Sequence, residues 1–189
     1  MSDELADAII SDAADRMGKA VVHARAEFSG IRTGRANPGL FEKLPVEYYG
    51  STVPMQQLAG FSVPDARMLM INPFDKSSIN AIERSIIDAN LGLNPSNDGA
   101  AIRIAFPPLT EERRKEFVKL ARARAEEGRN AVRSARRDAR KDLESMQRDG
   151  DLSEDELHRY EKQLDDRTRV SESEIDDALE QKTAELMEA

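Results

Sequence analysis

The sequence predicts a two-domain α+β protein, in which a small α+β domain is inserted into a long three-helix bundle. Near both ends of the chain, apolar residues recur every three or four positions, which indicates amphipathic helices. The central part instead has short apolar segments separated by glycine and proline, which indicates strands and turns. Only 39% of the residues are hydrophobic and 5% are aromatic, so long solvated helices fit this composition better than one deep globular core.

An apolar stripe predicts the first helix. Its members are spaced by three or four residues, and they are Leu5, Ile9, Ala13, Met17, Val21, Ala24, Phe28 and Ile31. The stripe fades at "GIRTGRANPG", where glycines and Pro38 interrupt helical structure. We therefore assign residues 1–31 to the bundle.

Residues 32–107 form the predicted inserted domain. "LPVEYYG" and "RMLMIN" are expected to be strands, and the residues expected to form turns between them are Pro45, Gly50, Pro54, Gly60 and Pro64. "FDKSSINAIERSIIDANLG" is expected to be a helix, with Asp75 as its N-cap and Gly92 as its stop. "NPSNDGAA" is expected to be a turn, and "IRIAF" a further strand.

Two long helices joined by a short break complete the predicted bundle over residues 108–189. Thr110 is a suitable N-cap for the first of them, whose narrow seam comprises Phe117, Ala121, Ala125, Gly128, Val132, Ala135, Ala139, Leu143 and Met146. Gly150 suits the end of this helix, and Ser153 with Glu156 matches a capping box that starts the next. The stripe expected on the last helix comprises Leu157, Tyr160, Leu164, Thr168, Ser171, Ile175, Ala178 and Leu186. The two joins between the domains, at Thr33–Gly34 and Pro107–Pro108, are predicted to form a hinge.

Charge is distributed unevenly along this chain of net charge -8. Residues 111–150 carry about +4 and residues 151–189 about -9. At about 100° per residue, one strip of the basic helix collects Lys115, Lys119, Arg122, Arg129, Arg133, Arg136, Arg137 and Arg140, interrupted by Glu126. The strip could form salt bridges with the acidic last helix. The planar guanidinium of arginine can make two hydrogen bonds to one phosphate. We therefore expect instead that this basic strip contacts the backbone of folded RNA.

Several other functions find no support in the sequence. There is no cysteine, no phosphate-binding loop and no nucleophile motif, and His23 and His158 stand alone. We therefore expect no enzymatic activity, no cofactor and no metal site. No apolar run approaches the roughly 20 residues of a membrane span, and the first residues do not resemble a signal peptide. A cytoplasmic protein without a membrane partner is expected.

Beyond these patterns, the sequence resembles the bacterial ribosome recycling factors. The resemblance is carried by "IRTGRANP", "VEYYG", "DKSSINAIERSI", "NPSNDGAAIRIAFPPLTEERRKEFVK" and "AVRSARRDAR", in this order and spacing. It implies a three-helix bundle and an inserted domain, joined by a flexible hinge into an L shape. It also implies a non-enzymatic monomer that binds post-termination ribosomes, with its bundle across the tRNA sites of the large subunit. There it would act with elongation factor G and GTP to split the subunits.

The resemblance also assigns residues to the ribosomal contact. Arg133, Arg136 and Arg137 match arginines that contact large-subunit ribosomal RNA, while Arg32 and Arg35 match a pair at the bundle tip near the peptidyl-transferase region. Arg129 and Arg140 join the predicted RNA-binding set on helical geometry alone. The last helix is more acidic than the resemblance leads us to expect. The alternative function is a helical scaffold whose charged faces bind proteins, and it predicts binding that ribonuclease does not affect.

Overall fold

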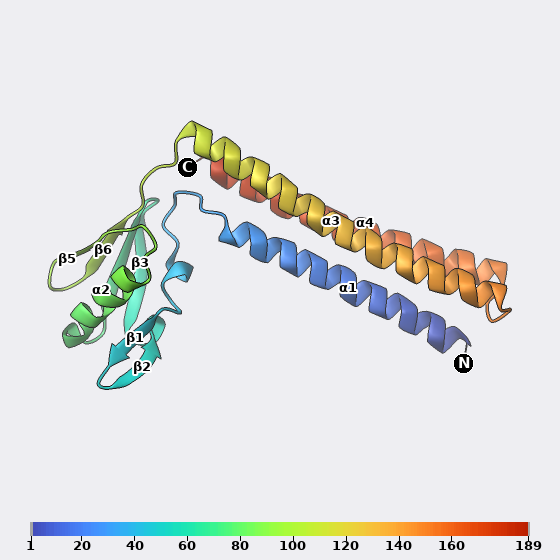
Figure 1. Cartoon of the computed structure of the whole chain (residues 1–189), viewed down its shortest axis with the longest axis horizontal. Coiled ribbons are helices and arrows are strands. Elements are labelled where there is room, and N and C mark those ends of the chain that lie inside the picture. Colours follow the sequence, from blue (N-terminus) through green and yellow to red (C-terminus); the bar gives the residue numbers. More distant parts are fainter. Residues whose placement is uncertain (1, 189) are drawn as a thin grey trace. The chain divides into compact units, whose positions relative to one another are not determined.

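The computed structural model describes residues 2–188 and divides them into a helical unit and a small α+β unit. The helical unit comprises residues 2–32 and 111–188, and the α+β unit residues 33–110. The helices are α1 (Ser2–Gly30), α2 (Ile79–Asp88), α3 (Glu111–Arg148) and α4 (Glu154–Glu188). The strands are β1 (Pro45–Tyr48), β2 (Ser51–Pro54), β3 (Ala59–Asp65), β4 (Met68–Pro73), β5 (Pro95–Asn97) and β6 (Ile102–Ala105) (Figure 1). This arrangement confirms the predicted α+β class with its three long helices.

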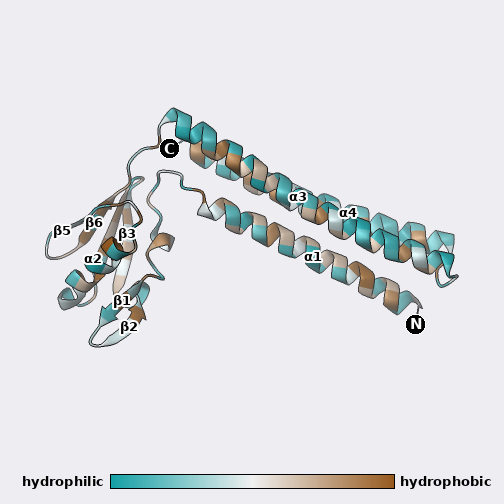
Figure 2. Ribbon diagram, viewed as in Figure 1, coloured by the Kyte–Doolittle hydropathy of each residue, from teal (hydrophilic) through white to brown (hydrophobic). Residues whose placement is uncertain are grey.

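The three long helices pack along one another, and every pair of them is in contact (Figure 1). Ion pairs from Arg16 to Asp138 and from Arg124 to Glu27 show that α1 and α3 run antiparallel. At 1.5 Å per residue, the 38 residues of α3 extend about 57 Å. Most residues of α3 are hydrophilic (Figure 2), and its buried residues form one narrow stripe, from Ala121 to Met146. None of the helices in the described part of the chain is long and apolar enough to span a membrane.

The apolar stripe of α1 departs from the prediction near its beginning. Leu5 is 55% exposed and Ile9 only half-buried, whereas Ala6 and Ile10 are buried. Four residues rotate by about 400° around the helix axis, which is about 40° more than one turn. A predicted stripe that repeats only four-residue steps therefore winds away from the side of α1 that faces the partner helices. The buried residues of α1 mix three- and four-residue steps, as helices that pack along their length require.

The α3 seam is confirmed from Ala121 to Met146, where every predicted member is buried, while Phe117 at its start is half-buried. The helix ends in a Schellman motif. Gly150 has a φ of 83° and donates to the Gln147 carbonyl, while the Asp151 N–H donates to the Met146 carbonyl. The predicted capping box is also present: the Ser153 N–H donates to Glu156 (2.8 Å), and the Glu156 N–H donates to the Ser153 hydroxyl (3.3 Å).

The packed face of α4 contains a charged residue that its apolar pattern did not predict. Tyr160, Leu164, Thr168, Ile175 and Leu186 are buried as predicted. The other predicted members, Leu157, Ser171 and Ala178, are half-buried. Lys182 is 9% exposed and keeps its ammonium 3.4 Å from Glu185. Its aliphatic stem covers apolar surface while its charged end meets a carboxylate, which explains how lysine occupies a stripe position.

The small unit combines a two-stranded sheet, β1-β2, with an antiparallel sheet in the order β3-β4-β6-β5. Helix α2 contributes Ile79, Ile82 and Ile86 to its core, and the main partners from the strands are Leu69, Ile71, Ile102 and Ile104. Asp75 accepts from the Ser77 N–H (2.9 Å) and caps the 3₁₀ turn that precedes α2. Helix α2 ends at Asp88, so Gly92 (φ 71°) lies beyond the end it was expected to mark.

Several residues predicted to form turns in this unit lie in strands. Pro45 begins β1, Pro54 ends β2, and Gly60 and Pro64 lie within β3. Pro95 to Asn97, predicted as part of a turn, form β5. Both β3 and β5 are edge strands, so their prolines need not donate to a neighbour on the open side. The β3–β4 register also shifts between Ser62 and Asp65, where Pro64 interrupts regular pairing.

Candidate nucleic-acid interface

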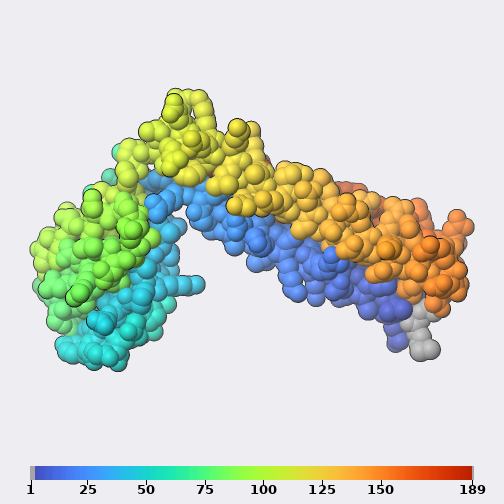
Figure 3. Space-filling model, in the orientation of Figure 1, coloured from blue at the N-terminus to red at the C-terminus, as the bar shows by residue number. Residues whose placement is uncertain are grey.

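The basic strip lies on α3, which runs along the surface of the helical unit beside α1 (Figure 3). The buried seam turns one side of α3 toward α1 and α4, so the arginines project beside α4 or into solvent. The structure separates the strip into two rows, which differ in what each side chain contacts.

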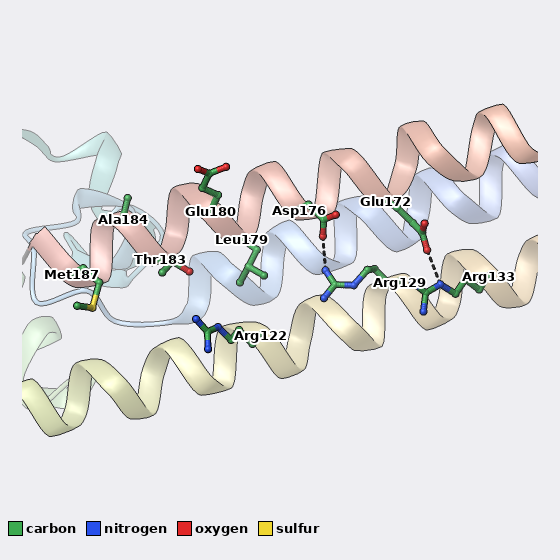
Figure 4. A pocket seen from close by; sticks show the side chains of 10 residues that line it. All are labelled: Arg122, Arg129, Arg133, Glu172, Asp176, Leu179, Glu180, Thr183, Ala184 and Met187. Carbon is green, nitrogen blue, oxygen red and sulfur yellow. Dashed lines mark hydrogen bonds and ion pairs between the residues drawn. The ribbon is translucent and has the colours of Figure 1, made fainter.

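The first row pairs with α4. Arg133 Nε lies 2.6 Å from Glu172, Arg136 Nε lies 2.9 Å from Asp165, Arg140 lies 3.0 Å from Glu161, and Arg129 pairs with Asp176. We call these four ion pairs the arginine ladder (two of them are drawn in Figure 4). The interpretation that the strip forms salt bridges with the last helix therefore applies to four of its arginines.

Three of these four arginines remain accessible despite their partners. The exposed fraction of the side chain is 46% for Arg133, 38% for Arg136 and 50% for Arg140, but only 19% for Arg129. A guanidinium has five N–H groups, and one or two ion pairs leave several of them unused. Arg140 also receives support within α3, since its hydrogen bond to Glu144, together with the charge of Glu161, raises its pKa above the usual value.

Within α3, Glu126 reinforces the ladder. Its carboxylate lies 3.0 Å from Arg129 Nε and 3.4 Å from Arg133 Nη1. The predicted interruption of the basic strip is thus a residue that orients two of its arginines.

Arg122 lies in line with the arginine ladder but is not part of it. It precedes Arg129 by seven residues, or about two turns, and therefore lies on the same face of α3. Figure 4 shows Arg122 in the groove between α3 and α4, which Leu179, Glu180 and Thr183 of α4 also line, with the Glu180 side chain pointing away from Arg122. Among the residues that the structure describes, no ion-pair or hydrogen-bond partner meets Arg122.

A second row points away from α4. Lys119, Arg137, Lys141 and Arg148 are exposed, and within residues 2–188 none of them has an ion-pair partner. Their spacings of about 18, 4 and 7 residues place them on one face of α3. We call this the outer row. Lys141 and Arg148 were not among the predicted site residues, although their helical spacing from Arg137 was a signal that could have found them.

The remaining predicted residues lie at the joins between the units. Arg32 is exposed in the helical unit, and Arg35 is exposed in the small unit. Gly34 has a φ of 77°, and a Cβ atom there would lie 3.3 Å from Leu109 Cγ and 3.6 Å from the Pro107 carbonyl oxygen. The segment that leaves the bundle and the segment that returns to it are therefore in close contact, next to Pro108. The hinge at Thr33, Gly34, Pro107 and Pro108 remains a prediction.

Comparison with known proteins decides the family. The model of the family described as "Ribosome recycling factor" matches residues 24–187. The chain belongs to the ribosome recycling factor family. The ribosome-recycling factor of Cutibacterium acnes is 61% identical over 121 residues, and that of Acidothermus cellulolyticus is 54% identical over 123 residues. These matches cover 64% and 65% of the chain and 66% of each relative, slightly less than two thirds of their length.

Solved structures of ribosome recycling factors match nearly the whole chain. A solution structure of a ribosome recycling factor has a TM-score of 0.81 and 40% sequence identity, and the match covers 97% of this chain and 98% of that one. The second match describes models of the T. thermophilus ribosome recycling factor and the E. coli elongation factor G bound to the E. coli post-termination complex. It has a TM-score of 0.65 and 41% identity, over 96% of this chain and 98% of that one.

Proposed function

We propose that this protein binds the ribosome after termination and, with elongation factor G and GTP, separates its subunits. The observation that carries the proposal is the cationic surface of α3, where the ladder and the outer row lie side by side over much of the helix. A related factor of 41% identity is described together with elongation factor G on a post-termination complex. In this proposal the chain binds and transmits force as a cytoplasmic monomer, and GTP hydrolysis belongs to the elongation factor.

The ribosomal partner of α3 is proposed to be the sugar-phosphate backbone of large-subunit RNA. Arg137 and the rest of the outer row offer charge without a protein partner, and the half-exposed ladder arginines offer further N–H donors. Such contacts position a protein on folded RNA without reading bases. Arg32 and Arg35 are proposed to add contacts at the bundle tip, and the joins at Thr33–Gly34 and Pro107–Pro108 to act as the hinge.

Arg137 provides the cleanest test, because its substitution breaks no ion pair. We expect Arg137→Ala to weaken ribosome binding by about tenfold and to reduce the dependence of log K on log salt by about one. Arg167→Ala is the matched control, since Arg167 is also exposed and lacks a partner among the described residues, but it lies on α4. Circular dichroism should show unchanged helicity in both variants.

Subunit separation itself is measured by light scattering. Post-termination ribosomes mixed with the protein, elongation factor G and GTP should lose scattering intensity, and Arg137→Ala should slow this loss more than Arg167→Ala does. A wild-type protein that causes no loss of scattering would exclude the proposed function. If the two substitutions had equal effects, the outer row of α3 would not be part of the ribosomal contact.

A further inference from the structure

The carboxylates of the arginine ladder form a regular row on α4. Glu161, Asp165, Glu172 and Asp176 are separated by about 4, 7 and 4 residues, so they share one helix face. Each of them meets an arginine of α3. The acidic last helix therefore places negative charge directly beside the surface that is proposed to bind RNA.

A contribution to the stability of the bundle does not explain this row of carboxylates. Asp165 and Asp176 are 51% and 58% exposed. Glu161 and Glu172 are less exposed, at 23% and 27%, but the arginines they meet, Arg140 and Arg133, are 50% and 46% exposed. Ion pairs that solvent reaches in this way contribute little to stability. The bundle is already held by its buried seam, in which Val132 and Leu143 of α3 and Ile175 of α4 are fully buried. Weak, exposed pairs are also those that a competing anion displaces most readily.

We infer that Glu161, Asp165, Glu172 and Asp176 are specificity-determining residues: they hold the ladder arginines in ion pairs that RNA must displace, and thereby suppress binding to RNA that does not match α3. The inference rests on the proposed function. A phosphate that binds Arg136 has to replace Asp165, whose carboxylate lies 2.9 Å from Arg136 Nε, and after the exchange the carboxylate remains close enough to repel the phosphate. Only an RNA that offers several phosphates in register along α3 gains enough contacts to offset this repulsion.

The cationic side chains of α3 that have no described partner provide the first contacts with RNA. Arg122 and Arg137 can bind phosphate without displacing any carboxylate. They provide the first contacts, and the ladder arginines add theirs once the RNA is correctly aligned. A polyanion that reaches only one or two positions therefore binds weakly, although α3 is strongly basic.

Adjacent aspartates on α4 allow a closely matched test. The variant Asp165→Asn/Asp176→Asn removes two ladder carboxylates. Its control, Asp166→Asn/Asp177→Asn, makes the same substitution one residue later, at positions where no described contact to the ladder exists. Both variants change the net charge equally and alter exposed residues, and circular dichroism verifies that both fold. The probe is a generic RNA duplex of about 20 base pairs, comparable in length with α3.

We expect the ladder variant to bind the duplex about tenfold more tightly than wild type, with a salt slope steeper by about one to two. The control should bind less than about twofold more tightly. Affinity for ribosomes should rise by a smaller factor in the ladder variant, so its selectivity for ribosomes over duplex falls. Adding Glu172→Gln should enlarge the effect.

Equal gains in duplex binding by the two variants would overturn the inference, because net charge alone would then explain them. A ladder variant that binds the duplex no better than wild type would overturn it as well. The duplex measurement does not involve ribosomes. If wild-type protein binds no ribosomes, the proposed function fails, while the effect of the carboxylates on RNA binding is still decided by the duplex.

Discussion

Gly128 of α3 faces both α1 and α4, and its substitution by alanine tests how closely the three long helices pack. A Cβ atom at Gly128 would lie 3.2 Å from Ala24 Cβ and 3.2 Å from Ile175 Cδ1. Optimal carbon–carbon separations are about 3.5–4.0 Å, so both neighbours would have to give way. Ile175 can adjust the end of its side chain, but Ala24 Cβ is fixed to the backbone of α1. The helix itself must therefore move.

The magnitude follows from two opposing effects. Replacing glycine by alanine within a helix contributes about 1 kcal/mol of stability, whereas overpacking a well-packed core costs about 1–3 kcal/mol. Because Ala24 cannot rotate away, we expect a net loss of about 1 kcal/mol for Gly128→Ala. Gly18→Ala is the matched control. Gly18 lies in α1, and a Cβ atom there meets nothing within 4 Å, so this substitution should stabilise by about 1 kcal/mol.

Urea unfolding followed by circular dichroism at 222 nm measures both effects, since the bundle supplies most of the helical signal. With a slope of about 1–3 kcal/mol/M, the two midpoints should shift in opposite directions by about 0.3–1 M. The double variant Gly128→Ala/Ala24→Gly removes one close contact, and it should show a favourable coupling of about 1 kcal/mol. If Gly128→Ala stabilised the protein as much as Gly18→Ala, close packing of α3 against α1 would be refuted.

Three further predictions concern the helix cap, acid stability and the joins. Ser153→Ala removes the N-cap of α4 and should lower the free energy of unfolding by about 1 kcal/mol in the same urea experiment, and an unchanged midpoint would contradict the cap. Hydrogen bonds from Ser77 and Tyr48 lower the pKa of Asp75, so its contribution to stability is present above about pH 4 and is lost as pH falls through its folded pKa. Asp75→Asn should therefore flatten the acid side of the small unit's stability profile, measured by hydrogen exchange of the amides in residues 33–110. Gly34→Ala should destabilise the small unit by about 1–2 kcal/mol, because alanine is strained at a φ of 77° and its Cβ would press on Leu109; hydrogen exchange that is unchanged in this unit would argue against it.

Local patterns in the sequence were sufficient for much of the helical unit. The α3 seam from Ala121 to Met146 could be predicted because periodicity, rather than any distant contact, determines which side of a long helix is apolar. The end of α3 at Gly150 and the start of α4 at Ser153 were equally predictable, since both caps use residues within a few positions of one another. Strands β2, β3 and β5 were missed, because edge strands tolerate the glycine and proline that elsewhere indicate turns.

In the candidate site, local sequence patterns predicted the helix face of each arginine but not its ion-pair partner. Helical spacing alone placed Arg122, Arg133 and Arg137 on one side of α3, since that depends only on the 3.6-residue turn. The sequence could not determine that Arg133 is paired while the other two are not. Arg133 meets Glu172 across 39 positions of sequence, and the alignment of α3 with α4 that brings them together depends on the length of the hairpin and the packing of the seam. The sequence by itself therefore determined the fold class and the basic helix face, and only the tertiary structure decided which arginines carry a free charge, because ion pairing depends on the register between helices.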